Sequence, residues 1–280
     1  MTREVRTAWM FVAPALAAIA LVALFPIAWT LWESLHLHDL RMPWRGRPFV
    51  GVANYAEIAG DVRFWGALAH TVMFTVAVVT LEVVLGLALA LLLDRPVRGR
   101  GALRVAALLP WAIPTVVVAL VWRFIFEIQA PWWFVSPSVA WVPIIAADVW
   151  RMTPFVAILL LAGLQQIDPA IYEAARMDGA GMWRQFREIT LPLLKPALVV
   201  AVLFRALDAF RVFDLIFVMT GGGPGTATEP LSVYAFTSLL RNLRFGFGSA
   251  LSVVVFAIAF AGALLWITLM GSSTLLENPE

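Results

Sequence analysis

Long apolar segments separated by short polar connections dominate this chain. Apolar runs cover about residues 8–32, 66–93, 105–126, 141–164, 197–220 and 248–270. Each run is long enough for a helix of about 20 residues that crosses a hydrocarbon core about 30 Å thick. The runs are continuous and do not alternate as barrel strands do. The pattern therefore predicts an all-α integral membrane protein with six transmembrane helices in a single domain, residues 1–280.

Composition supports a membrane protein. Hydrophobic residues make up 62% of the 280 positions and charged residues 14%, whereas soluble domains have about half and about a quarter. The first run could be the core of a signal peptide, but it exceeds the usual length of about 7 to 15 residues. The chain has a net charge of +2, and its arginines lie beside apolar runs. This placement favours lipid headgroups over nucleic acid as the partner of the arginines.

The connections carry structural signals of their own. Residues 94–104 form a basic turn that we expect in the cytoplasm, and residues 271–280 form a polar tail. Pro110 and Pro114 predict a kink in the third helix. Gly221–Gly225 is expected to be a turn, since no strand-to-helix context supports a nucleotide-binding loop.

The most polar interruption of the second half lies between Asp168 and Pro196. Asp168 can cap a short helix whose first turn holds Pro169. Asp178-Gly179 predicts a turn, because glycine tolerates a positive φ. A second short amphipathic helix should follow, with Met182, Trp183, Phe186 and Ile189 on its apolar side, Arg184 and Glu188 paired on the other, and its end at Leu191-Pro192.

Several charges fall inside the apolar runs. Glu82 must face protein or stay protonated, because a charge facing lipid costs about 2.5 to 3.5 kcal/mol. Asp148 and Arg151 are spaced to pair on one helix face. In the fifth run Arg205, Asp208, Arg211 and Asp214 recur every third residue with alternating sign, among Phe204, Phe210, Phe213 and Phe217. This series can be a salt network that only packs helices. Alternatively, part of it can line a wet cavity or meet charged groups on another helix, such as the Asp148 and Arg151 pair.

The chain has no evident catalytic chemistry. It contains no cysteine, no G-x-x-x-x-G-K-[ST], no H-E-x-x-H and no G-x-S-x-G, and its three histidines form no i, i+4 pair. We therefore expect no metal, cofactor or catalytic residue in this chain, and energy for any work must come from another subunit.

The polar loop resembles a specific motif. Glu173-Ala174-Ala175, then Gly179, then Ile189-Thr190-Leu191-Pro192 are similar to the EAA loop of ABC-importer permeases. Asp178-Gly179-Ala180 and the stretch LFRALDAFRVFDLIFVMTGGGPGTATE resemble the sugar-permease branch, which includes maltose, glycerol-phosphate and trehalose importers. Within that branch the pattern is most like the first permease subunit of trehalose importers.

This resemblance implies a fold, a role and functional residues. It implies the type I ABC-importer fold, with a cytoplasmic coupling helix between helices 4 and 5. The residues it assigns to ATPase coupling are Glu173, Ala174, Ala175, Asp178, Gly179, Met182, Trp183, Phe186, Ile189, Leu191 and Pro192. The residues it assigns to the substrate pathway are Phe204, Arg205, Asp208, Arg211 and Asp214.

The resemblance also implies partners and a location. The expected partners are a second homologous permease, two copies of a cytoplasmic ATPase subunit that binds ATP and Mg, an extracytoplasmic sugar-binding protein and the lipid bilayer, with no nucleic acid. The chain itself would be no enzyme. It would lie in the bacterial inner membrane with both termini cytoplasmic, and import a disaccharide such as trehalose or maltose, or alternatively another polar solute such as glycerol phosphate.

Two other classes remain open from the residues alone. Intramembrane acids such as Glu82 and Asp208 also suit a secondary transporter with a proton relay. Such a transporter would need no ATPase, so purification with or without an ATPase subunit separates the two hypotheses. A membrane-bound enzyme or structural subunit is disfavoured, because no catalytic set can be assembled.

Overall fold

The computed structural model describes residues 3–95 and 99–271. Part of the expected basic turn, residues 96–98, and the tail after residue 271 lie outside the described residues. The described residues form helices, with isolated bridges His36–Phe49 and Asp39–Arg244 as the only β-type pairing. The chain divides into two compact units, Met1–Trp65 with Tyr234–Ile258 and Gly66–Val233 with Ala259–Glu280, each described by itself.

Unit 1 begins with α1 (Arg3–Ile19), a π-helical turn (Ala20–Leu24) and α2 (Phe25–Ser34). A polar segment then leads to α3 (Ala53–Gly60), where the Asn54 amide donates to the carbonyls of Ser34 and His36 at 2.8 and 3.0 Å. Arg41 donates to the Asp39 carboxylate at 2.9 Å, which holds the pKa of that carboxyl below its usual value. The Asn54 bonds hold α3 against the start of the polar segment, because they satisfy two backbone carbonyls there.

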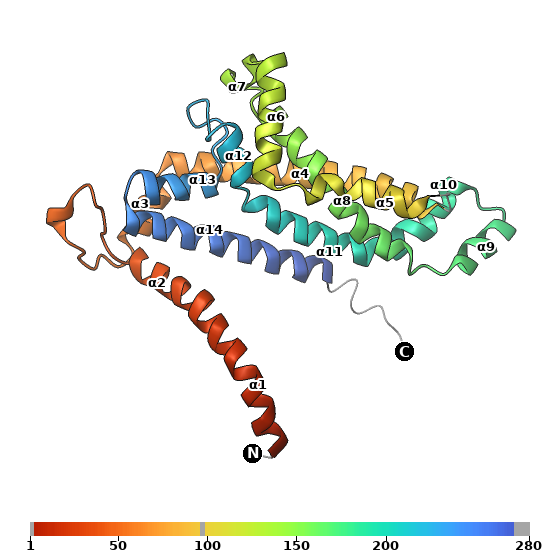
Figure 1. The fold of residues 1–280 in the computed structure, drawn as a ribbon, viewed down its shortest axis with the longest axis horizontal. Coiled ribbons are helices and arrows are strands. Elements are labelled where there is room, and N and C mark those ends of the chain that lie inside the picture. The colour runs from red at the N-terminus through yellow and green to blue at the C-terminus, as the bar shows by residue number, and fades with distance from the viewer. Residues whose placement is uncertain (1–2, 96–98, 272–280) are drawn as a thin grey trace. The chain divides into compact units, whose positions relative to one another are not determined.

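Unit 2 holds most of the helices (Figure 1). Their bounds are α4 Val62–Asp94, α5 Arg100–Ala112, α6 Thr115–Gln129, α7 Trp132–Val135, α8 Trp141–Leu164, α9 Pro169–Met177, α10 Met182–Gln185, a π turn Phe186–Thr190, α11 Leu191–Phe210 and α12 Asp214–Met219. The last elements, divided between the units, are α13 Leu231–Phe236, a π turn Thr237–Arg241, α14 Phe245–Trp266 and a π turn Ile267–Gly271.

Five helices in the described part of the chain are long and apolar enough to cross a membrane: Trp9–Ser34, Val62–Asp94, Trp141–Leu164, Met182–Phe210 and Phe245–Met270. The sixth expected span is a pair of helices, α5 and α6, that meet at an angle of 84°. The predicted kink is confirmed, because Pro114 caps α6 in an extended conformation and lacks the N–H that would continue α5. A bend of this size is typical of a broken span or of a loop that re-enters the membrane.

The bounds predicted for the fifth helix, residues 197–220, are wrong at both ends. The helical run starts at Met182 and stops at Phe210, and α12 begins a new helix at Asp214. Pro192 does not end the amphipathic helix as expected, because it lies in the first turn of α11 after the π turn, where its missing N–H is tolerated. The amphipathic segment and the membrane span are therefore one continuous helical run.

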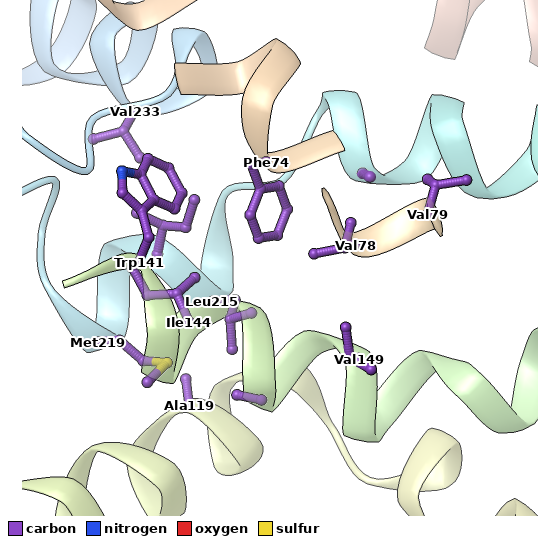
Figure 2. Packing of buried hydrophobic residues seen from close by; sticks show 13 residues of the cluster. Phe74, Val78, Val79, Ala119, Trp141, Ile144, Val149, Leu215, Met219 and Val233 are labelled. Carbon is purple, nitrogen blue, oxygen red and sulfur yellow. The ribbon is translucent and has the colours of Figure 1, made fainter. Parts of the chain in front are cut away.

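The core of unit 2 brings α4, α6, α8 and α12 together. Phe74, Trp141, Ile144, Leu215 and Met219 pack side by side in its buried cluster (Figure 2). Farther along, glycines let the helices approach closely. A Cβ at Gly86 of α4 would lie 2.8 Å from Val156 of α8, and one at Gly163 of α8 would lie 2.6 Å from the Ala197 Cβ of α11. These close approaches allow side chains of α4 to contact α8, and side chains of α8 to contact α11.

Candidate functional site

A buried ion cluster joins α4, α8 and α11. Glu82, Asp148 and Arg205 are each almost completely buried. Arg205 Nε and Nη2 donate to the two carboxylate oxygens of Glu82, the second at 3.0 Å, and Nη2 also donates to Asp148. Nη1 donates to Asp208 Oδ2 at 3.0 Å. All three guanidinium nitrogens have carboxylate partners, which is the arrangement a buried arginine needs.

A cavity of about 220 Å³ opens beside this cluster. It is lined by Thr115, Asp148, Arg151, Arg205, Asp208, Ala209, Arg211, Val212, Phe213, Asp214 and Leu215, and we refer to it as the charged cavity. Asp208 lies between two arginines, since its Oδ1 is 3.8 Å from Arg211 Nη2. Arg151 Nη2 is 3.6 Å from Asp148 Oδ1, so the pair expected from their spacing is confirmed.

The structure brings most, but not all, of the expected pathway residues to the charged cavity. Arg205, Asp208, Arg211 and Asp214 all line the charged cavity. Phe204 does not, and its side chain is largely exposed on α11. These four charged residues do not lie on one helix, because α11 ends at Phe210 and Asp214 starts α12. The break turns Arg211, Phe213 and Asp214 toward the same cavity, which a continuous helix would spread around its circumference.

Sequence reasoning missed part of this site. The pairing of Arg205 with Glu82 and Asp148 crosses 123 and 57 residues of chain, so no local spacing reports it. Thr115 lines the cavity from the start of α6, immediately after the bend. The available signal was the requirement that intramembrane charges find partners. It indicated that Glu82 faces protein or stays protonated, and it suggested the Asp148 and Arg151 pair as a partner for the fifth-run charges, which the contact between Arg205 and Asp148 confirms. It did not pair Glu82 with Arg205.

Apart from the helix end expected at Pro192, the loop between α8 and α11 has the local structure predicted for it. Asp168 Oδ1 accepts from the Ala170 N–H at 2.8 Å and caps α9. Gly179 has φ +75° and allows the turn after α9, where Ala180 N donates to Ala175 O at 2.9 Å. Arg184 pairs with Glu188 at 2.8 Å. Tyr172 and Thr190 hydroxyls lie 3.0 Å apart and tie α9 to the π turn.

The loop also carries exposed apolar side chains. Met182 and Trp183 are 86% and 73% exposed, and Trp183 stacks on Phe186 with ring centroids 5.6 Å apart. Ile189 is half-buried, and Leu191 and Pro192 begin α11. Glu173, Ala174 and Asp178 are exposed and Ala175 is half-buried. In Figure 1, α9 and α10 lie beyond the ends of α8 and α11. Met182 and Trp183 therefore leave apolar surface exposed at this loop.

Helices long and apolar enough to cross a membrane, a charged cavity lined from α6, α8, α11 and α12, and a helical loop with exposed apolar residues are typical of an integral membrane transport subunit. The chain belongs to the family of binding-protein-dependent transport system inner membrane components, whose family model matches residues 82–278. It is thus a multi-pass inner-membrane protein and the permease component of an ABC importer, and the resemblance noted from the polar loop is confirmed.

Relatives extend this match over almost the whole chain. The trehalose/maltose transport system permease protein MalF of Thermococcus litoralis is 40% identical in an alignment of 280 positions, which covers 95% of this chain and 94% of that protein. The trehalose transport system permease protein SugA of Mycobacterium tuberculosis is 39% identical, covering 96% and 90%. A crystal structure of a bacterial ABC transporter that imports the acidic polysaccharide alginate has the same fold, with a TM-score of 0.80, 20% identity and coverage of 97% and 98%.

Proposed function

We propose that this chain is one permease half of an ATP-driven, binding-protein-dependent importer of a sugar, with trehalose or maltose as the first substrates to test. The observation that carries the proposal is the near full-length identity of about two positions in five with permeases named for trehalose and maltose transport. ATP-dependent uptake of radiolabelled trehalose and maltose by the reconstituted complex tests it.

The charged cavity is the proposed site through which the sugar passes. Its carboxylates and guanidinium groups accept and donate hydrogen bonds, and Phe213 adds an aromatic face. The cavity lies beside the buried cluster of α4, α8 and α11, so a shift of these helices would change its shape. Arg205, Asp208, Arg211 and Asp214 are the proposed pathway residues, and Phe204 is proposed to face the neighbouring permease or lipid.

Asp208→Asn is expected to lower sugar transport about tenfold while the complex stays assembled. Asp208 is 42% exposed, so its removal leaves Arg205 with the buried carboxylates of Glu82 and Asp148. Transport should fall because the cavity loses an anionic acceptor, and hydrogen bonds to charged groups contribute about 1.5 to 3 kcal/mol. Initial uptake rates and the yield of complex from the membrane are the two measurements.

The control is Glu127→Gln, which removes a similarly exposed carboxylate that pairs with Arg123 on α6 and does not line the cavity. Transport by this variant should be unchanged. Loss of the Asp208→Asn protein from the membrane would instead support a packing role for Asp208.

The loop after α8 is the proposed joint with the ATPase. Its coupling residues would be Glu173, Ala174, Ala175, Asp178, Gly179, Met182, Trp183, Phe186, Ile189, Leu191 and Pro192. The exposure of Met182 and Trp183 supports this role, since a helix as short as α10 persists in water by burying its apolar face on something. Two copies of the ATPase subunit would bind ATP and Mg, and this chain would hold no cofactor.

The proposed cycle is alternating access. This chain would pair with a second homologous permease, and a binding protein would deliver sugar from outside. Closure of the ATPase subunits on ATP would move α9 and α10 as a lever, because the Tyr172–Thr190 contact links α9 to the helical run that continues into α11. The Arg205 end of that run would transmit the movement to the charged cavity.

This proposal fixes an orientation, with the coupling loop and both termini in the cytoplasm. The chain has no cysteine, so single cysteines can report it. Arg184→Cys should stay unlabelled by an impermeant maleimide added to intact cells, whereas Arg45→Cys and Thr226→Cys should react. All three positions are exposed, so burial does not protect them. Labelling of Arg184→Cys from outside, before cells are opened, would contradict the orientation.

A further inference from the structure

A second cavity, between α4, α5 and α8 of unit 2, is not explained by the proposed sugar pathway. Its volume is about 270 Å³, and none of the described residues that line it also lines the charged cavity. Most of its lining is apolar. We refer to it as the interhelical cavity, and its apolar lining includes Leu89 and Leu93 of α4, Ala107 and Leu108 of α5, and Ile158 and Leu161 of α8.

The polar residues of the lining are Arg104 and Gln165, and both lie near helix ends. Arg104 is about one turn after the start of α5, and Gln165 is the C-cap residue of α8, just before α9 and the coupling loop. Among the described residues of this lining, Arg104 is the charged one and no carboxylate is present. An anion at this polar end would therefore be attracted by Arg104 without repulsion from an acid in the lining.

The connection between α4 and α5 adds more positive charge at the same helix ends. In the sequence, residues 94–104 contain four arginines and one acid, Asp94. Arg95 directly follows α4, and its side chain is exposed. In the proposed orientation these helix ends lie on the cytoplasmic side, where the membrane surface is negative. Basic clusters next to a transmembrane helix, and basic pockets between helices on that side, bind anionic lipid headgroups.

The rest of the interhelical cavity suits a hydrocarbon chain. Leu89, Leu108 and Ile158 lie about one to two turns farther from the helix ends than the polar residues do. The cavity volume exceeds the roughly 150 Å³ of an apolar cavity that binds benzene, so several methylene groups fit inside. Trp111 of α5 stacks on Phe155 of α8 with ring centroids 5.8 Å apart, which fixes one wall against another. A site that is basic at one end and apolar beyond it matches an amphiphile.

We propose that the interhelical cavity binds one anionic phospholipid, with an acyl chain between α4, α5 and α8 and the phosphate on Arg104. Arginine suits this role because its guanidinium group binds phosphate oxygens with two parallel hydrogen bonds, and its carbon chain packs on apolar surface. The bound lipid would hold α5 against α8, close to the bend at which α6 begins. This inference takes from the proposed function only the cytoplasmic side of these helix ends, and its ligand is not the transported sugar.

The test uses two photoactivatable phospholipids that carry the same diazirine-labelled acyl chains, one a phosphatidylglycerol and the other a phosphatidylcholine. Each is added in small amount to phosphatidylcholine nanodiscs that contain the purified full complex, and cross-linked peptides are identified by mass spectrometry. The phosphatidylglycerol probe should label peptides that contain Leu108 and Ile158 about fivefold more than the phosphatidylcholine probe does, because one basic residue near a membrane contributes about 1 kcal/mol toward anionic lipid. Peptides of α14 that contain the exposed Phe260 are the reference, and both probes should label them equally.

Variants of two arginines then separate the site from general surface charge. Arg104→Gln should lower labelling by the phosphatidylglycerol probe about fivefold at the cavity peptides. Arg104→Lys keeps the charge and should retain about half of the labelling or more. Arg95→Gln is the matched control, because it removes an exposed arginine from the same connection but outside the cavity lining, and it should leave the preference unchanged. Millimolar inorganic phosphate should not displace the probe, since it has no acyl chain.

Four results would overturn the inference. They are equal labelling of the cavity peptides by the two probes, no labelling of these peptides, an equal loss of labelling in Arg95→Gln, and displacement of the probe by inorganic phosphate, which would indicate a site for a soluble anion. If Arg104→Gln fails to assemble, the comparison of the two probes on the unaltered complex still decides the question. A complex that transports sugar but shows no lipid preference contradicts this inference alone, whereas a complex that prefers the anionic lipid but transports no sugar contradicts the proposed function alone.

Discussion

Arg205→Gln is expected to remove the protein from the membrane fraction almost completely. The variant leaves Glu82 and Asp148 buried, and Glu82 loses both of its hydrogen bonds to the arginine. Removing one partner of a buried pair costs about 3 to 5 kcal/mol, which is a large part of the stability of an ordinary domain. The measurement is the amount of monodisperse protein recovered in detergent, followed by fluorescence-detected size-exclusion chromatography.

Two further variants test whether the loss of protein comes from unpaired buried charge. Arg211→Gln is the control, because Arg211 is 78% exposed and its loss leaves no buried charge unpaired, so recovery should be normal. Arg205→Gln combined with Glu82→Gln should recover much of the lost yield, since Asp148 retains Arg151 nearby. Normal recovery of the single variant, or no rescue by the double variant, would contradict a charge-based role for Arg205.

Gly179→Asp and Glu173→Lys are expected to abolish sugar-stimulated ATP hydrolysis while membrane insertion stays normal. Gly179 has φ +75°, a conformation that costs other residues about 1 to 2 kcal/mol, and no neighbouring atom would obstruct a side chain there. The damage should therefore come from a shifted turn between α9 and α10 and not from a clash. Glu173 is exposed on α9, where reversal of its charge should disrupt a partner surface.

Gly181→Ala provides the control for this loop. Gly181 lies two residues farther along with φ −69°, and an added Cβ there also meets nothing within 4 Å. Its ATP hydrolysis should match the unaltered protein. If Gly179→Asp and Glu173→Lys co-purified with the ATPase at normal yield and still transported sugar, the loop would not be the coupling element.

Much of the local structure followed from short-range physical rules. Hydropathy located the spans because a lipid-facing helix must be apolar over its whole length. Asp168 and Gly179 predicted a cap and a turn because each acts through its own backbone neighbours. Asp148 and Arg151 were correctly paired because their contact lies within one helix. Such contacts depend only on positions close in sequence.

The remainder depended on contacts between distant segments. Pro192 predicted a helix end, but the preceding π turn places it where a helix accepts proline. The break between Phe210 and Asp214 has no glycine or proline to announce it, and Ser232 from a distant segment donates to the Val212 carbonyl within it. Neither this break nor the partners of Arg205 could be derived from spacing along one helix, and together they form the charged cavity.

ATP-dependent sugar uptake is the most direct test of the central claim. Proteoliposomes would contain this chain, its partner permease and the ATPase subunits, with ATP inside and binding protein plus radiolabelled trehalose or maltose outside. We predict accumulation of sugar that stops when ATP is omitted or when Glu173→Lys replaces the native chain. Accumulation without ATP, driven by a proton gradient alone, or the absence of uptake for every disaccharide tested, would contradict the assignment as a sugar-importer permease.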